Sequence, residues 1–196
     1  MAGRGAARDA SGMDPLIAAQ AADGFYRQSQ GFVQSIPVDS GVTSATISMG
    51  DLICSATCVA LSIELFLKSL LILVGRPVPA THDLRDLYEA VPEGYKRAIR
   101  AFHRRQVTGR PGEAVSLRMV YGGDGSGPPQ GPLPDQAEGD SVEAVLERNR
   151  DAFCSWRYLH EIALQQGPVV VDYEYRQLSK IAAAVSDTCH GLVHGT

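Results

Sequence analysis

The sequence predicts an all-α fold, an antiparallel helical bundle of five or six helices with one long Gly/Pro-rich insertion. Three observations support this prediction. Apolar residues recur at helical spacing along most of the chain, helix start and stop signals divide it, and one stretch is too rich in Gly and Pro for regular structure. With 196 residues, of which 44% are hydrophobic, the chain is long enough for one domain with a substantial core.

Four helices are expected before the insertion. Their predicted ranges are 14–32, 49–74, a short helix from residue 81 or 82, and 92–105, with a connector at 37–48. The second helix is the most apolar and ends at Gly75, which Pro77 follows. Its apolar run contains Glu64 and Lys68 and falls short of the roughly 20 residues that a membrane span needs. We therefore predict a buried core helix and no membrane partner.

The insertion is predicted at residues 108–140, with a short extended segment at 115–121. A helix is expected to follow over 141–165, then a β-branched run at 169–171 and a last helix over 173–189. The predicted domain organisation is an N-terminal tail at 1–13, a single helical domain at 14–190 and a C-terminal tail at 191–196.

Composition bears on the compartment and on the partners. The net charge of −4 and the pI near 5.7 argue against a strongly basic, nucleic-acid-coating surface, although a local basic patch remains compatible with them. The first twelve residues lack the apolar segment of a secretory signal, so we expect a cytoplasmic protein. The cysteines are then expected to be buried reduced thiols, at Cys54, Cys58, Cys154 and Cys189.

Two charged pairs stand at helical spacing, the first of them on an otherwise apolar helix. Glu64 and Lys68 are four residues apart, and either face water or belong to a buried polar network. On the helix after residue 141, Arg150, Arg157 and Glu161 are spaced by seven and four, which predicts one shared face. In the second interpretation, the Arg157–Glu161 pair cross-links to Glu64 and Lys68 in the bundle.

Other polar residues are weaker candidates. His82, at the start of a helix, is expected to be a cap or local hydrogen-bonding group unless it is functional. The fourth helix is basic and offers candidate phosphate contacts at Lys96, Arg97, Arg100, His103 and Arg104. The C-terminal Cys189, His190 and His194 lack a second ligand cluster, and the glycines at 122–125 lack the strand, helix and Lys of a nucleotide loop. We therefore predict no metal and no cofactor.

Three segments, taken in order, resemble the HEPN superfamily of nucleotide-binding helical domains. The run ALSIELFLKSLL from Ala60, then Gly75 and THDL from Thr81, is similar to the family pattern E-L-x-L-K-x-L, Gly, H-D-L-x-x-L. The run AFCSWRYLHE from Ala152 is similar to the F-x-x-W-R-Y-x-x-E segment of one bacterial branch. The resemblance covers about residues 49–175 without the insertion.

The resemblance implies a helical bundle that usually forms homodimers. Many members are metal-independent endoribonucleases, often toxins or phage-defence components, and others bind nucleotides, RNA or a partner protein without catalysis. The family's catalytic signature is an Arg, often followed directly by Asn, and a His separated from the Arg by four to six residues. Arg148 and Asn149 match the first part, but positions 153–155 hold Phe, Cys and Ser, so a degenerate catalytic motif is implied.

Three functions are therefore considered. The preferred one, because the expected catalytic His is missing, is an HEPN-like module that binds RNA or a nucleotide. Its binding residues would be Glu64, Lys68, His82, Arg148, Asn149, Arg157, Tyr158 and Glu161. The second is an active metal-independent endoribonuclease, with His82, Arg157 and Glu161 as catalytic candidates. The third is a non-catalytic dimer that binds a partner protein.

Overall fold

The computed structural model describes residues 12–34, 49–107, 117–121, 141–166 and 169–194. These residues form eight helices and two strands, in the order α1 (Pro15–Gln34), α2 (Met49–Leu73), α3 (Leu84–Ala90), α4 (Glu93–Val107), β1 (Leu117–Tyr121), α5 (Val142–Arg148), α6 (Ala152–Arg157), α7 (Leu159–Gln166), β2 (Val169–Tyr173) and α8 (Tyr175–His194). The predicted all-α bundle is confirmed, although the helices are more numerous and shorter after the insertion. The connector at 37–48, most of the N-terminal tail and most of the insertion lie outside the described residues.

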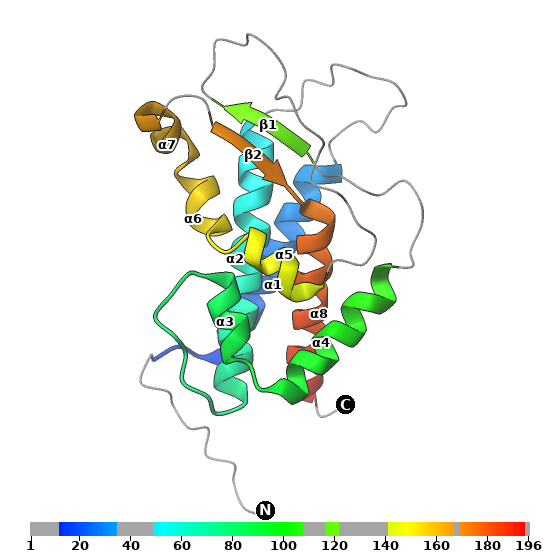
Figure 1. Cartoon of the computed structure of the whole chain (residues 1–196). Coiled ribbons are helices and arrows are strands. Elements are labelled where there is room, and N and C mark those ends of the chain that lie inside the picture. The colour runs from blue at the N-terminus through cyan, green and yellow to red at the C-terminus, as the bar shows by residue number, and fades with distance from the viewer. Residues whose placement is uncertain (1–11, 35–48, 108–116, 122–140, 167–168, 195–196) are drawn as a thin grey trace, which may run out of the picture.

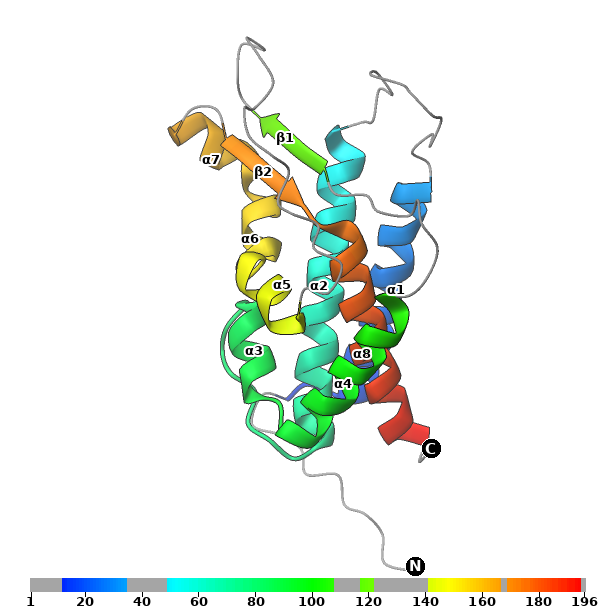
Figure 2. The same ribbon diagram turned by 45° about the vertical axis from the view of Figure 1, so that its right-hand side comes forward.

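Helix α2 is the centre of the bundle. Helices α1, α3, α6 and α8 all pack against it, α4 packs on α8, and α5 contacts both α3 and α8 (Figure 1). Both views place α7 and the two strands together at one end of the bundle (Figure 2). Each large apolar side chain that α2 buries stabilises the fold by roughly 1.5–3 kcal/mol. The large apolar residues that α2 buries completely are Val59, Ile63, Phe66, Leu67, Leu70 and Leu71.

Length and apolar composition alone would allow one helix of the described chain, over Gly50–Leu73, to cross a membrane. Its mean hydropathy is 2.0, and 61% of the most apolar stretch is buried inside the bundle. Helix α2 therefore has the placement predicted from its sequence, that of a core helix.

A line of serines on α2 faces α1. The Ser55 hydroxyl donates to the Ser29 carbonyl oxygen at 3.1 Å, and the Ser69 hydroxyl donates to the Pro15 carbonyl oxygen at 2.7 Å. Ser62 satisfies its own hydroxyl locally, on the Val59 carbonyl oxygen. Small side chains with satisfied hydroxyls let the two helices approach closely without leaving a buried polar group unpaired.

The end of α2 agrees with the prediction from its sequence. Gly75 adopts a left-handed φ of +68°, which a glycine takes without a steric cost. Its N–H donates to the Ile72 carbonyl oxygen, and the Arg76 N–H donates to that of Leu71. This pair of hydrogen bonds is a Schellman motif, and it turns the chain toward α3.

The single helix predicted over 141–165 is wrong, because the chain there forms α5, α6 and α7. At the first break the Arg150 carbonyl oxygen accepts the Leu84 N–H instead of continuing the helical pattern. The Asn149 side chain turns back to donate to the Val145 carbonyl oxygen at 2.9 Å. Contacts with α3 thus override the helical periodicity of the sequence.

Strands β1 and β2 pair antiparallel, with Leu117 opposite Tyr173 and Tyr121 opposite Val169. Strand β1 is the extended segment expected within the insertion. Helix α8 continues to His194, past the predicted end at residue 189, so residues 191–194 belong to this helix and not to a tail.

Candidate functional site

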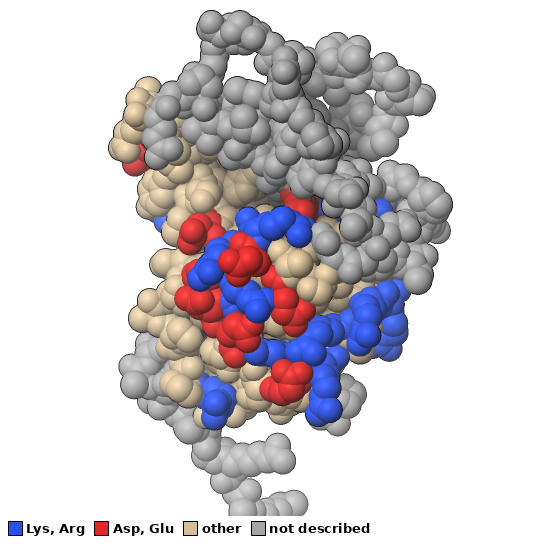
Figure 3. Space-filling model, viewed as in Figure 1, with Lys and Arg blue, Asp and Glu red and all other residues tan. Residues whose placement is uncertain are grey.

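The face formed by α3, α4 and α5 carries a dense set of ion pairs, visible as mixed acidic and basic side chains in Figure 3. Arg150 joins α3 to α5: its guanidinium donates to Asp83 at 2.7 Å and pairs with Asp86 and Glu147 at 3.2 Å. Burial acts to raise the pKa of Asp83, but hydrogen bonds from the Asp86 N–H and from Arg150 hold that pKa below its ordinary value. We call this surface the ion-pair face, made by Asp83, Arg85, Asp86, Glu89, Glu93, Lys96, Arg100, Glu143, Glu147 and Arg150.

Helix α4 contributes its cations to the same face. The Lys96 ammonium donates to Glu89 at 2.6 Å, and this hydrogen bond is the main cause that lowers the pKa of Glu89. Arg100 pairs with Glu93 at 2.8 Å and with Glu143 at 2.9 Å. Each of these cations therefore already has an internal carboxylate.

The five predicted phosphate contacts on α4 consequently differ in availability. Lys96 and His103 are buried, so the interpretation of these two as surface contacts to phosphate is wrong. Arg100 is neutralised by two glutamates. Arg97 and Arg104 are exposed, and Arg104 donates to the Arg100 carbonyl oxygen. Helix α4 therefore exposes Arg97, Arg104 and Arg105, while its other cations are buried or paired with carboxylates.

The Glu64–Lys68 pair belongs to a buried polar group, the second of the two alternatives left open by the sequence. The Glu64 side chain is only 3% exposed, and its Oε1 accepts from the Lys68 Nζ at 2.7 Å. The same carboxylate faces the Nδ1 of His82, with its two oxygens at 2.9 and 3.1 Å. Asp83 and not His82 caps α3, so the His82 ring is available for this contact.

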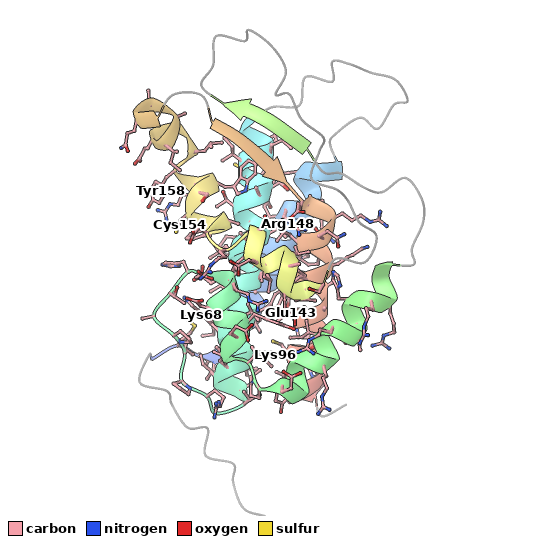
Figure 4. The ribbon with its side chains drawn as sticks, in the orientation of Figure 1. Lys68, Lys96, Glu143, Arg148, Cys154 and Tyr158 are labelled. Carbon is pink, nitrogen blue, oxygen red and sulfur yellow. The ribbon has the colours of Figure 1, made fainter. Side chains whose placement is uncertain are left out.

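Aromatic rings and a cation continue this group onto α6. The rings of His82 and Phe153 lie with centroids 5.6 Å apart. The Arg157 guanidinium lies 5.7 Å from the Phe153 centroid and 5.2 Å from that of Tyr158. We call these four side chains the α6 stack. Figure 4 labels Tyr158 at the α6 edge of the molecule, away from Lys96 on the ion-pair face.

The α6 stack is open to solvent. The His82 side chain is 58% exposed and Tyr158 is 40% exposed, while Phe153 is half-buried and packs against the core. Arg157 is also exposed, and no acidic side chain among the described residues forms an ion pair with it. This arrangement presents stacking surface, one uncompensated cation and one imidazole edge to a ligand.

Arg148 and Asn149 form a separate group around a buried carboxylate. The Arg148 guanidinium donates to Glu174 through Nε and Nη2, at 2.8 Å for the shorter contact, and the Asn149 amide donates to the other oxygen at 2.7 Å. Glu174 is 7% exposed and stands at the start of α8. This contact fastens α5 to α8, and it places the two residues outside the α6 stack.

The structure therefore brings together only part of the predicted site. Glu64, Lys68 and His82 meet directly, and Arg157 joins them through Phe153. Glu161 lies exposed on α7 beside His160, at 3.7 Å, so the predicted Arg157–Glu161 cross-link to Glu64 and Lys68 is wrong. Phe153 was missed as a site residue, although its spacing of four from Arg157 is a signal for an aromatic–cation pair on a helix.

The cysteines show a gradient of exposure. All four are free, with Cys54 exposed, Cys58 and Cys154 half-buried and Cys189 buried. Burial raises the pKa of Cys189 to about 12, so this thiol stays protonated. The prediction of buried thiols is wrong for Cys54. Within the described residues, His, Cys, Asp and Glu side chains form no group of three or more placed to hold a metal ion.

Comparisons of the chain with protein-family models, with curated proteins and with solved structures give no match.

Proposed function

We propose that this protein is an HEPN-like helical module that binds RNA or a nucleotide at the α6 stack, with a degenerate catalytic motif. The observation that carries the proposal is Arg157, an exposed cation that lies over two aromatic rings and has no ion-pair partner among the described acidic side chains. Aromatic rings stack on bases, and a guanidinium beside them binds phosphate.

The charge balance of the site favours an anionic ligand. Glu64 carries one negative charge, which Lys68 neutralises at 2.7 Å, and Arg157 adds a further positive charge at the surface. A phosphate at Arg157 would thus meet an uncompensated cation, whereas on the ion-pair face it would compete with carboxylates already in place.

Binding of a fluorescein-labelled mixed-sequence RNA, followed by fluorescence anisotropy at several salt concentrations, tests this proposal. We expect Arg157→Ala to weaken binding about tenfold and to reduce the salt slope by about one, because one phosphate contact is lost. Arg27→Ala is the matched control, since Arg27 is an exposed cation on α1, outside the stack. Equal affinities for the two variants, or no RNA binding by the wild type, would contradict the proposal.

A second candidate function, metal-independent RNA cleavage, is favoured by the contact between Glu64 and His82. A carboxylate that orients a histidine ring is an arrangement used in general acid–base catalysis. The same RNA incubated with a chelator and separated on a gel distinguishes the two functions. Intact RNA supports binding alone, and cleavage that disappears in His82→Ala establishes a nuclease.

A further inference from the structure

We propose that the C-terminal end of α8 is a site for a divalent transition-metal ion such as Ni²⁺, Cu²⁺ or Zn²⁺, held by the side chains of His190 and His194. Asp23 of α1 orients His190 for this role. Both views place this end of α8 at the other end of the bundle from α7 and the two strands (Figures 1 and 2). The site is separate from the α6 stack and goes beyond the proposed function.

The two histidines share one face of α8. Residues four apart in a helix lie one above the other on the same side, and α8 extends to His194. The His190 side chain is 42% exposed, and His194 is exposed as well. Two imidazoles at this spacing are a recurring ligand pair for zinc, and imidazole also suits copper and nickel.

The distance between the two rings agrees with a shared ion. Their centroids lie 6.3 Å apart, with 45° between the ring planes. An imidazole nitrogen binds such an ion at about 2.1 Å, so two rings that share it have centroids at most about 6.5 Å apart, and about 5 Å apart when the two bonds meet at roughly 100°. Exposed side chains change rotamer readily, and a small rotation of the rings covers this difference.

A carboxylate of the neighbouring helix fixes the His190 ring. Asp23 Oδ2 lies 3.1 Å from His190 Nε2, and Asp23 Oδ1 accepts a hydrogen bond from the Ser186 hydroxyl at 3.3 Å. A carboxylate accepts and does not donate, so neutral His190 carries its proton on Nε2 and its lone pair on Nδ1. Histidines that bind metals usually donate their other N–H to a carboxylate in this way, which fixes the ring and raises its basicity.

The surroundings favour a cation with two protein ligands. Unpaired carbonyl groups give the C-terminal end of a helix a partial negative charge. Cys189, beside His190 in the sequence, is not a ligand, because it is buried and its thiol donates to the Phe66 carbonyl oxygen at 3.4 Å. Two ligands agree with the finding that the described residues contain no group of three or more placed to hold a metal ion. Water completes the coordination of the ion.

Titration of Ni²⁺ into the protein, prepared without a histidine tag, tests the site by isothermal titration calorimetry. Ni²⁺ is the probe because it binds imidazole well and, unlike Cu²⁺, does not oxidise thiols. Loss of an outer partner of a metal site costs about 10–100-fold in affinity, so loss of a direct ligand in His194→Ala should weaken binding by about 100-fold or more. His160→Ala is the matched control, because His160 is an exposed histidine on α7 with no second histidine at helical spacing.

Asp23→Asn separates orientation of the ligand from packing of the helices. Asparagine keeps the size of the side chain and loses its charge, so we expect the Ni²⁺ affinity to fall about tenfold while both histidines remain. The Tm of the metal-free variant measures any loss of packing between α1 and α8. A lower metal-free Tm with an unchanged Ni²⁺ affinity would show a purely structural role and overturn the role assigned to Asp23.

The double variant Cys54→Ser/Cys58→Ser tests the thiols of α2 as an alternative site. Ni²⁺ binding of wild-type strength in this variant supports the histidine site, whereas its loss would assign the ion to the thiols and overturn the inference. Failure of the wild type to bind Ni²⁺, or equal affinities of the wild type and His194→Ala, also overturns it. None of these results bears on RNA binding at the α6 stack.

Discussion

The α6 stack and the ion-pair face use cations in opposite ways. On the ion-pair face, Arg150 and Arg100 each contact two or more carboxylates. In the α6 stack, Arg157 lies over two aromatic rings and has no described carboxylate partner. The first region joins α3, α4 and α5, and the second leaves a charge for a ligand. Whether a surface can bind an anionic ligand therefore depends less on how many cations it carries than on whether those cations already contact carboxylates.

A buried carboxylate supports the stack, whereas most carboxylates of the face are exposed, and this difference gives the largest expected effect. Glu64→Ala leaves the Lys68 ammonium, whose side chain is only 13% exposed, without its counter-ion. We expect a loss of about 3–5 kcal/mol in the free energy of unfolding, measured by urea denaturation. Glu93→Ala on the face should cost less than about 1 kcal/mol, because the Glu93 side chain is 63% exposed and Arg100 keeps its contact with Glu143.

The double variant Glu64→Ala/Lys68→Met is the control for this experiment. It removes the uncompensated charge and should recover most of the lost stability. Similar losses for Glu64→Ala and Glu93→Ala would show that the two regions do not differ in the way described.

One cation from each region should separate stability from binding. Lys96→Ala removes a buried stem, an ion pair with Glu89 and a contact over the Tyr88 ring, so we expect a loss of about 1–2 kcal/mol in stability. Its RNA affinity should stay within about twofold of the wild type, a change of under half a kcal/mol. Arg157→Ala should do the reverse. If Lys96→Ala lost RNA affinity although the protein remained folded, RNA would bind at the ion-pair face and not at the α6 stack.

A fall in pH should reduce the stability that the ion-pair face contributes, by less than the losses predicted for the substitutions above. The pKa values of Asp83 and Glu89 are lowered in the folded protein, so their ionised forms contribute stability that is present above the ordinary carboxyl range of about 4. This contribution is lost as the pH falls through the lowered values. Asp83→Asn, which keeps a capping side chain, should be slightly less stable than the wild type at pH 7.

The gap between Asp83→Asn and the wild type should be under about 1 kcal/mol at neutral pH and should be smaller at pH 3, below the ordinary carboxyl pKa of about 4. Thermal unfolding at the two pH values measures it. A gap that persists in acid would mean that the Asp83 charge does not stabilise the face.

The sequence predicted the elements that depend on local signals. The Gly75 stop and the core position of α2 followed from its apolar run and its C-terminal cap. The sequence could not predict the break after α5. That break depends on a hydrogen bond between the Leu84 N–H and the Arg150 carbonyl oxygen, which are 66 positions apart in the chain.

The same limit applies to the site. The spacing of Glu64 and Lys68 showed a pair but not its burial, and the third member, His82, reaches it only through the turn before α3. Lys96 and Arg157 are both cations in helical segments, and their sequences alone do not show that one contacts Glu89 and the other lies on Phe153. Partner choice between distant elements decides which cation remains available.

The pairing of β1 with β2 has a consequence for how this chain can vary in length. Because Tyr121 pairs with Val169, the two strands join the ends of the stretch of chain that separates them in sequence, and α5, α6 and α7 all belong to this stretch. The entropy of closing such a loop grows only with the logarithm of its length, by about 0.6 kcal/mol for each doubling. Residues added between β1 and α5 should therefore cost the fold little, while the strands continue to hold both ends of the segment that carries the α6 stack.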